Sequence, residues 1–255
     1  MKRSYSAVLL VCLSACLMCF GLVRLFPAPD LSKTYSIGTD RVYPYHDVDA
    51  SGAPRGFVAE VLSEAARRNG VKLEWRPTAK TLLGALNDGD VDLWPLVSTD
   101  LKQSHPELHT TAPWLNNDYA FVAINPLFRN PANFSTIQTV AGRRSSGIEK
   151  LAREHFRQGR FAAHTDRRAA IEAVCRGDAD GAIVELRVAH YFLAAPPPAC
   201  AGKVPCFIGL TFRREQMVTA ARPEAAAIAD LLRAEIGRMA KDGALDRILL
   251  PWAYY

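Results

Sequence analysis

Apolar residues follow strand and helix periods in turn along the first half of the chain. Val71, Leu73 and Trp75 alternate with polar residues, which is the period of a half-buried strand. Between residues 57 and 69 the apolar residues recur at helical spacing, and Gly70 supplies the left-handed stop typical of a helix end. The full pattern predicts strands at 35–40, 71–75 and 91–96, with helices at 57–69 and 82–89 between them. This alternation favours parallel strands joined by helical crossovers.

The same order of elements restarts after residue 125. Each half carries a Gly-Asp-x-Asp signature between a helix and a strand, at 89–92 and at 177–180. The repeat predicts two similar α/β lobes rather than one long sheet. In the second half we expect strands at 137–141, 161–163 and 181–185 and helices at 147–156 and 165–176.

The end of the chain is predicted to return to the first lobe. Three consecutive prolines at 196–198 mark a surface loop, residues 212–221 are extended, and helices follow at 222–241 and 245–250. Helices that pack back on the first lobe require two crossings between the lobes, which creates a hinged cleft. We therefore divide the chain into an N-terminal segment, a first lobe, a second lobe and a return to the first lobe, at 1–30, 31–122, 123–212 and 213–255.

Residues 1–30 are predicted to direct export. Lys2 and Arg3 precede an apolar run from residue 7 to 23, an order that export machinery recognises. The run is short for a membrane-spanning helix, which needs about 20 residues. Three outcomes stay open: cleavage near residues 26–28, retention as a membrane anchor, or lipid attachment at Cys16. All three predict a periplasmic or extracytoplasmic protein, secreted or tethered to the membrane by this segment alone.

The composition is that of a folded globular protein, with 49% hydrophobic and 22% charged residues. The net charge of +5 is mild, and no cluster of Lys and Arg interleaves with aromatic residues, so nucleic acid is not a predicted partner. No metal-ligand spacing and no phosphate- or dinucleotide-binding loop occurs in the sequence. We therefore predict no metal and no cofactor.

Three of the six cysteines lie beyond the export segment. Cys200 and Cys206 lie across a Pro-rich loop, and in an oxidising compartment they are predicted to form a disulfide. Cys175 falls on the apolar side of the helix at 165–176, so we expect it to be a small core residue.

Several short motifs follow one another along the chain. They are Ile37-Gly38-Thr39-Asp40, Tyr43-Pro44-Tyr45, Gly89-Asp90-Val91-Asp92, Thr111-Ala112-Pro113-Trp114, residues 177–185, and the ending from Asp242-Gly243 to Trp252. In this order they resemble the family 3 bacterial extracellular solute-binding proteins. The likeness covers nearly all of residues 35–255, and the order of the motifs makes it specific. It implies a periplasmic binding protein-like fold: two α/β lobes with a hinge of two crossover strands and a ligand cleft between them.

The resemblance implies ligand contacts from both lobes. Asp40 and Tyr43 fall on the family's first cleft loop, where an aromatic ring packs on the ligand; the alternative for Tyr43 is a turn aromatic that covers local core. Ser145, Ser146 and Gly147 begin a second-lobe helix, where family members offer N–H groups and hydroxyls. A helix N-terminus suits a carboxylate. The alternative is a plain serine N-cap.

Glu185 ends the strand that in amino-acid binders ends in an Asp accepting from the ligand ammonium. The alternative is a charge at the end of a strand. The arginine that grips the α-carboxylate in those binders is missing after the strand at 91–96. Lys102 takes that position if the alignment has a small gap, and Ser104 takes it if the alignment has none. A lysine lacks the two-point fork of a guanidinium, so recognition of the carboxylate is looser or absent. Trp94 adds bulk that suits an apolar part of a ligand, or it packs in the core.

The function implied by the resemblance is capture of a small polar solute, amino-acid-like or a small carboxylate or amine, by a monomer that serves an ABC permease. A ligand-sensing domain that signals to a membrane partner is the alternative. An enzyme similar to cyclohexadienyl dehydratase, with Asp40 and Glu185 as acid or base, is a third reading. We expect a binding protein without catalytic residues.

Overall fold

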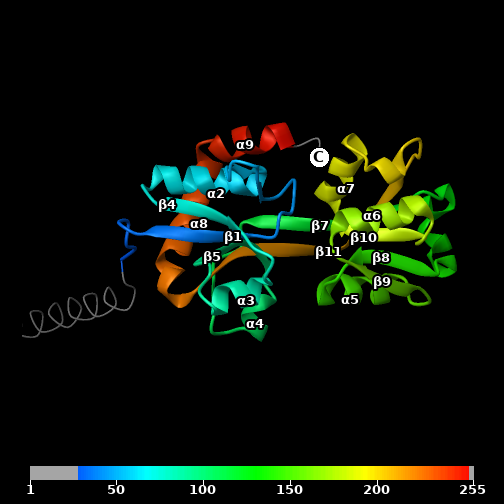
Figure 1. Ribbon diagram of the computed structural model, residues 1–255, viewed down its shortest axis with the longest axis horizontal. Helices are drawn as coiled ribbons and strands as arrows, with labels where there is room; N and C mark the ends of the chain where they lie inside the picture. Colours follow the sequence, from blue (N-terminus) through cyan, green and yellow to red (C-terminus); the bar gives the residue numbers. More distant parts are fainter. Residues whose placement is uncertain (1–27, 253–255) are drawn as a thin grey trace, which may run out of the picture.

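The computed structural model describes residues 28–252, as two groups of elements joined by two long strands (Figure 1). We call the group around β1 the first lobe and the group around β8 the second lobe. The predicted export segment, with Cys12, Cys16 and Cys19, lies outside the described residues. Within residues 28–252 no helix combines the length and the apolar character needed to cross a bilayer.

In the first lobe, β1 pairs in parallel with β4 on one side and with β5 on the other, as the crossover pattern predicts. α2 packs with α8 and α9 on one face of these strands, so the last helices of the chain do return to this lobe (Figure 1). The elements are β1 (Thr34–Thr39), β2 (Asp47–Val48), β3 (Pro54–Arg55), α2 (Phe57–Arg68), β4 (Lys72–Pro77), α3 (Leu82–Asn87), β5 (Leu93–Ser98), α4 (Leu101–Ser104), β6 (His109–Thr110), α8 (Ala226–Lys241) and α9 (Ala244–Leu249).

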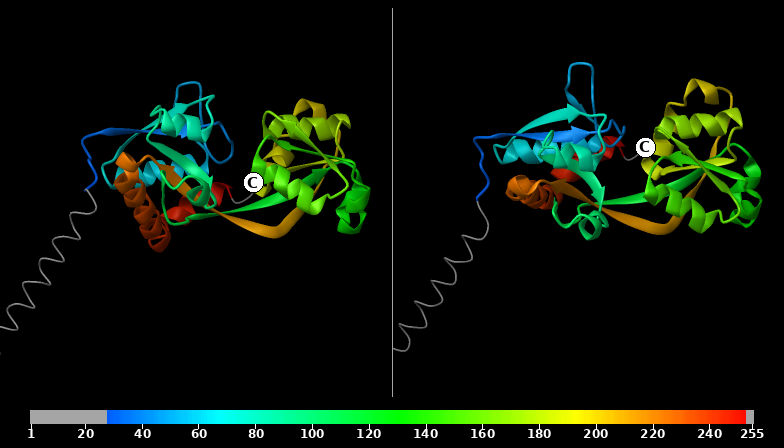
Figure 2. Two further views of the ribbon diagram at one scale, coloured as in Figure 1. Left: turned by 90° about the horizontal axis from the view of Figure 1, so that it is seen from below. Right: turned by 60° about the horizontal axis from the view of Figure 1, so that its bottom comes forward.

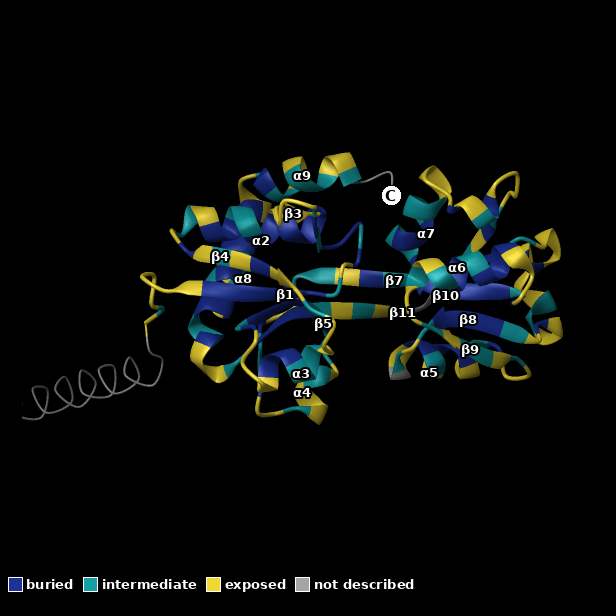
Figure 3. Cartoon of the chain, viewed as in Figure 1, coloured by how far each residue is buried: buried dark blue, intermediate teal, exposed yellow. Residues whose placement is uncertain are grey.

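The second lobe repeats this arrangement. β8 pairs in parallel with β9 and with β10, and its helices lie on both faces of the strands (Figure 2). β8 and β10 are buried for most of their length, whereas the edge strand β9 and the outer helix faces are more exposed (Figure 3). The elements are β8 (Thr139–Arg143), α5 (Ser146–His155), β9 (Arg160–His164), α6 (Arg167–Arg176), β10 (Gly181–Glu185) and α7 (Leu186–Ala194), with the 3-10 turns Pro126–Arg129, Pro131–Thr136 and Pro198–Cys200; 3-10 turns Pro223–Ala225 and Leu250–Trp252 lie near the chain end in the first lobe.

The repeated signature has a structural role in each lobe. The Oδ2 atom of Asp92 accepts hydrogen bonds from the backbone N–H and the hydroxyl of Ser36, both at 2.9 Å, at the start of β1. Asp180 accepts from the backbone N–H of Gln138 and Thr139 at 2.7 and 2.8 Å, at the start of β8. The second Asp of each signature therefore ties the neighbouring parallel strand into its sheet.

Two strands connect the lobes, β7 (Leu115–Ala123) and β11 (Cys206–Ala221). β11 pairs with β5 of the first lobe and β7 pairs with β10 of the second, while β7 and β11 pair with each other. The strand order is β4-β1-β5-β11-β7-β10-β8-β9, so hydrogen bonding is continuous, where we expected two separate sheets. The reason is that the linking strands are long enough to serve both lobes. The register between them shifts between Leu210 and Glu215.

The predicted disulfide is wrong. Cys200 bonds to Cys175 of α6, 25 residues earlier, with their Cα atoms 5.0 Å apart, and Cys206 is a free, buried thiol. Cys175 is buried, as predicted, but it is a disulfide partner and not an isolated core residue. The Pro-rich loop folds back onto α6, which carries Cys200 to Cys175, whereas Cys206 enters β11.

Candidate functional site

Three charged residues stand at the carboxyl ends of parallel strands. Asp40 follows β1, while Arg143 ends β8 and Glu185 ends β10. Ligands in open α/β folds bind outside the carboxyl ends of the strands, where the connections diverge. The topology therefore brings side chains from both lobes to one place.

Asp40 and Arg143 meet across the boundary between the lobes. The Nη1 atom of Arg143 donates to Oδ2 of Asp40 at 3.2 Å. The two side chains keep 28% and 36% of their exposure, so water reaches this pair. Asp40 was predicted from the sequence and Arg143 was not, because nothing in a strand-end arginine distinguishes it from a solvated charge until the lobes are placed against each other.

Glu185 is not available in the way we expected. Arg167, at the start of α6, donates to it through Nε at 2.9 and 3.1 Å and through Nη2 at 2.5 Å. Burial alone raises the pKa of a carboxyl, but the charge and hydrogen bonds of Arg167 outweigh burial and hold the pKa of Glu185 below its usual value. Burial likewise disfavours the charged form of Arg167, and the carboxylate of Glu185 overcomes it, so the pKa of Arg167 is raised. Both groups are ionised and paired within the second lobe.

Polar side chains of the first lobe and of β7 surround these charges. Burial raises the pKa of the Tyr45 phenol, whose hydroxyl donates to Oδ1 of Asn117. His46 is buried, with Nδ1 2.9 Å from the hydroxyl of Thr39, and burial lowers its pKa to about 4. His46 is therefore neutral near pH 7. The hydroxyl of Tyr119 donates to Glu215 at 2.6 Å.

Aromatic rings close the same boundary from another side. Tyr43 of the first lobe lies edge-on to Tyr191 of α7, with ring centroids 4.7 Å apart, and also contacts Trp252 near the chain end at 5.8 Å. The guanidinium of Arg187, also on α7, lies 5.4 Å from the ring centroid of Phe57 on α2. Tyr43 therefore contacts the second lobe, and its contact with a ligand stays a prediction.

The other predicted ligand contacts lie at the start of α5 in the second lobe and on α4 in the first lobe. Ser145 is the N-cap residue of α5 in an extended conformation, without a side-chain capping hydrogen bond, and Gly147 is exposed in the first turn. Ser146 begins α5. Lys102 is exposed on the short helix α4.

Trp94 is a core residue. It keeps 4% of its exposure and packs with Leu86, Val97 and other apolar side chains below the first lobe's strands. A Cβ atom on Gly38 would lie 2.6 Å from its ring, so the glycine at this position of β1 makes room for the indole. We therefore assign Trp94 to packing and not to ligand contact.

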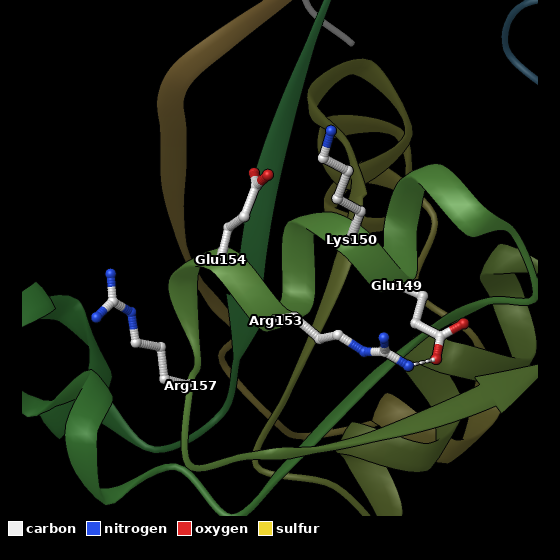
Figure 4. Close-up of a pocket in the computed structure, with 5 residues that line it drawn as sticks. All are labelled: Glu149, Lys150, Arg153, Glu154 and Arg157. Carbon is white, nitrogen blue, oxygen red and sulfur yellow. Dashed lines mark hydrogen bonds and ion pairs between the residues drawn. The ribbon is translucent and has the colours of Figure 1, made fainter.

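Two cavities lie elsewhere on the described residues. One, of about 490 Å³, is an open depression along α5 lined by charged side chains (Figure 4). In it Arg153 and Glu149 form an ion pair of 2.5 Å, as exposed side chains four residues apart on a helix commonly do. The other, of about 20 Å³, is apolar and lies beside the Cys175–Cys200 disulfide. Among residues 28–252 no cluster of His, Cys, Asp and Glu has the form of a metal site.

The family model for the bacterial extracellular solute-binding proteins, family 3, matches residues 35–254. The chain belongs to this family. The match spans both lobes and the linking strands, so membership in family 3 rests on the whole fold. No curated protein sequence gives a match.

Solved structures with the same fold are about one-fifth identical to this family 3 protein. The ancestral amino acid-binding protein AncCDT-1, described as a precursor of cyclohexadienyl dehydratase, is 20% identical with a TM-score of 0.71, over 87% of this chain and 96% of that one. An ancestral arginine-binding protein bound to arginine is 20% identical with a TM-score of 0.70, over 86% and 98%. A histidine kinase sensor domain is 20% identical with a TM-score of 0.70, over 87% and 96%. At these identities the likeness shows the fold alone.

Proposed function

We propose that this protein is an extracytoplasmic receptor whose two lobes close on a small polar solute and that it delivers this solute to an ABC permease. The observation that carries the proposal is the ion pair between Asp40 and Arg143, which joins the lobes at the ends of their central strands. Because these two side chains come from different lobes and stay partly exposed, a ligand could bind between them and form hydrogen bonds with both lobes. The lobes that we propose to move are residues 31–122 with 213–255, and residues 123–212.

The proposal is tested by thermal unfolding of the full chain with amino acids, small carboxylates and amines. A ligand at about 100 times its dissociation constant stabilises a protein by about 2.7 kcal/mol, which raises the Tm of a chain of this size by roughly 5–10 °C. Small-angle scattering with the same ligand should show a change in the radius of gyration. Absence of both effects across the panel contradicts the proposed function.

A sensory role is the second candidate, because a sensor domain of a histidine kinase and the B. pertussis BvgS periplasmic domain are among the similar structures. Cells that lack the protein separate the two roles. Loss of uptake of the bound solute supports transport. Intact uptake with a lost transcriptional response to that solute supports sensing. We also propose binding without turnover, so nuclear magnetic resonance should recover the ligand unchanged.

A further inference from the structure

The carboxylate that the family resemblance assigns to a ligand ammonium is already largely occupied by Arg167. Glu185 receives three N–H···O contacts from Arg167, two to Oε1 and one to Oε2, and its side chain keeps only 10% of its exposure. A carboxylate has about four acceptor positions. An ammonium that approached Glu185 would have to displace part of a buried, forked pair, which is strongly unfavourable.

The pair between Asp40 and Arg143 has the opposite character. One hydrogen bond joins the two side chains, at 3.2 Å, among the contacts of the described residues. A guanidinium has five N–H donors, so most of the donor capacity of Arg143 remains for another acceptor. Asp40 keeps one oxygen, Oδ1, outside this bond. Both side chains can therefore exchange partners at little cost.

The carboxylate of Asp40 also shows that Arg143 accepts a carboxylate that approaches from the first lobe. Arg143 is the last residue of β8 and lies two positions before Ser145, the N-cap of α5. A carboxylate of a ligand at Arg143 would thus lie near the start of α5, where the helix dipole favours negative charge. The guanidinium supplies the forked geometry that Lys102 lacks.

From these contacts we infer that the ligand is a zwitterion that inserts between Asp40 and Arg143, with its carboxylate on Arg143 of the second lobe and its ammonium on Asp40 of the first. This orientation is the reverse of the one that the family resemblance implies, in which an arginine of the first lobe holds the carboxylate and the strand-end acid of the second lobe holds the ammonium. The inference rests on the proposed function. Arg143 is then a binding residue. Arg167 determines the orientation of the ligand, because it pairs with Glu185 and keeps the ligand ammonium away from that carboxylate.

Matched probes that each lack one charged group test this orientation. We would measure dissociation constants by calorimetry for three sets: L-glutamate, glutarate and 4-aminobutyrate; L-lysine, 6-aminohexanoate and cadaverine; L-phenylalanine, 3-phenylpropionate and 2-phenylethylamine. In each set the second compound lacks the α-ammonium and the third lacks the α-carboxylate. The proteins are the full chain and its variants Arg143→Gln, Asp40→Asn and Arg167→Gln/Glu185→Gln. Arg144→Gln removes a neighbouring exposed arginine and serves as the control.

For the set that binds, Arg143→Gln should weaken binding of the amino acid and of the compound without the α-ammonium about tenfold or more, and leave binding of the compound without the α-carboxylate unchanged. Asp40→Asn should weaken binding of the amino acid and of the compound without the α-carboxylate, and leave binding of the compound without the α-ammonium unchanged. The double variant Arg167→Gln/Glu185→Gln, in which no buried charge is left unpaired, should still bind the amino acid more tightly than the compound without the α-ammonium.

Two results overturn the inference while the proposed function survives. In the first, the wild-type chain binds the amino acid more tightly than the compound without the α-ammonium, Arg167→Gln/Glu185→Gln loses this preference, and Asp40→Asn keeps it. In the second, Arg143→Gln binds every probe as Arg144→Gln does. If the wild-type chain binds none of the nine probes, the proposed function fails for these solutes and the inference fails with it.

Discussion

The interior of the second lobe and the boundary between the lobes use similar side chains in different ways. Inside the lobe, Arg167 and Glu185 form a buried, forked pair, and the Cys175–Cys200 disulfide ties the Pro-rich loop to α6. At the boundary, Asp40 and Arg143 share one hydrogen bond and remain partly exposed. The second lobe is thus held together by a buried pair and a disulfide, whereas the boundary is joined by a partly exposed pair, and the closure that we propose needs this difference.

The largest effect should come from breaking the buried pair. Glu185→Ala leaves the Arg167 charge buried without its partner, so we expect the free energy of unfolding to fall by about 3–5 kcal/mol, measured by urea denaturation. Arg167→Met/Glu185→Leu removes both charges and should recover most of this loss. Glu172→Ala breaks partly exposed pairs with Arg168 and Arg176 on the same helix and should cost under about 1 kcal/mol. If Glu185→Ala cost as little as the control Glu172→Ala, the Arg167–Glu185 pair would contribute no more to stability than a partly exposed ion pair, which contradicts this prediction.

Removing the disulfide should have the next largest effect. The bond closes a loop of 25 residues, for which chain entropy predicts a stabilisation of about 3 kcal/mol. Cys175→Ala/Cys200→Ala should lower the free energy of unfolding by this amount, and reduction of the wild-type protein should do the same. Peptide mapping should link Cys175 to Cys200. A peptide that links Cys200 to Cys206 would contradict the fold of the Pro-rich loop.

Acid should lower the free energy of unfolding through the buried His46 of the first lobe. The pKa of His46 is about 4 in the folded protein and 6.5 as a free side chain, so the unfolded chain binds more protons between these values and stability falls as the pH is lowered. From pH 7 to pH 4.5 the loss should be about 2 kcal/mol. His46→Gln should flatten this slope. The contribution of Glu185 is lost only as the pH falls below 4.5, outside this window. An unchanged slope in His46→Gln would show that other groups carry the pH dependence.

The smallest effect on stability should come from the boundary pair. Arg143→Gln breaks a partly exposed ion pair, so we expect the free energy of unfolding to change by less than about 1 kcal/mol. The radius of gyration, measured without added ligand, should increase because one contact between the lobes is gone. A loss above about 2 kcal/mol would mean that the boundary is as fixed as the interior of the lobe.

The strands and helices of both lobes were predictable because their apolar periods are regular and their ends carry glycine or a capping side chain. Asp166 caps α6, and Gly177 ends it in the left-handed conformation. Helix α7 was not predicted. Its N-cap, Glu185, makes no capping hydrogen bond and its C-terminus has no glycine, so local signals are absent.

The partners of the charged and sulfur-containing side chains were less predictable. Sequence proximity favoured Cys200 with Cys206, but three cysteines allow three pairings and the fold decides among them. Arg167 reaches Glu185 only because α6 and β10 are neighbours in the second lobe, and Arg143 reaches Asp40 only because two lobes touch. These contacts depend on tertiary structure, which short motifs do not encode.

The shift in register between the two linking strands has a mechanical consequence. On one side of it Glu215 pairs with Asn117, and on the other Leu210 pairs with Tyr119, so β11 has extra residues at this point of the ladder. A hydrogen-bonded pair of strands resists bending within its own plane, because such bending would stretch the hydrogen bonds, and it twists more readily. The closure that we propose should therefore occur by twisting of the two strands about this interruption, and the amount of twist should limit how far Asp40 separates from Arg143.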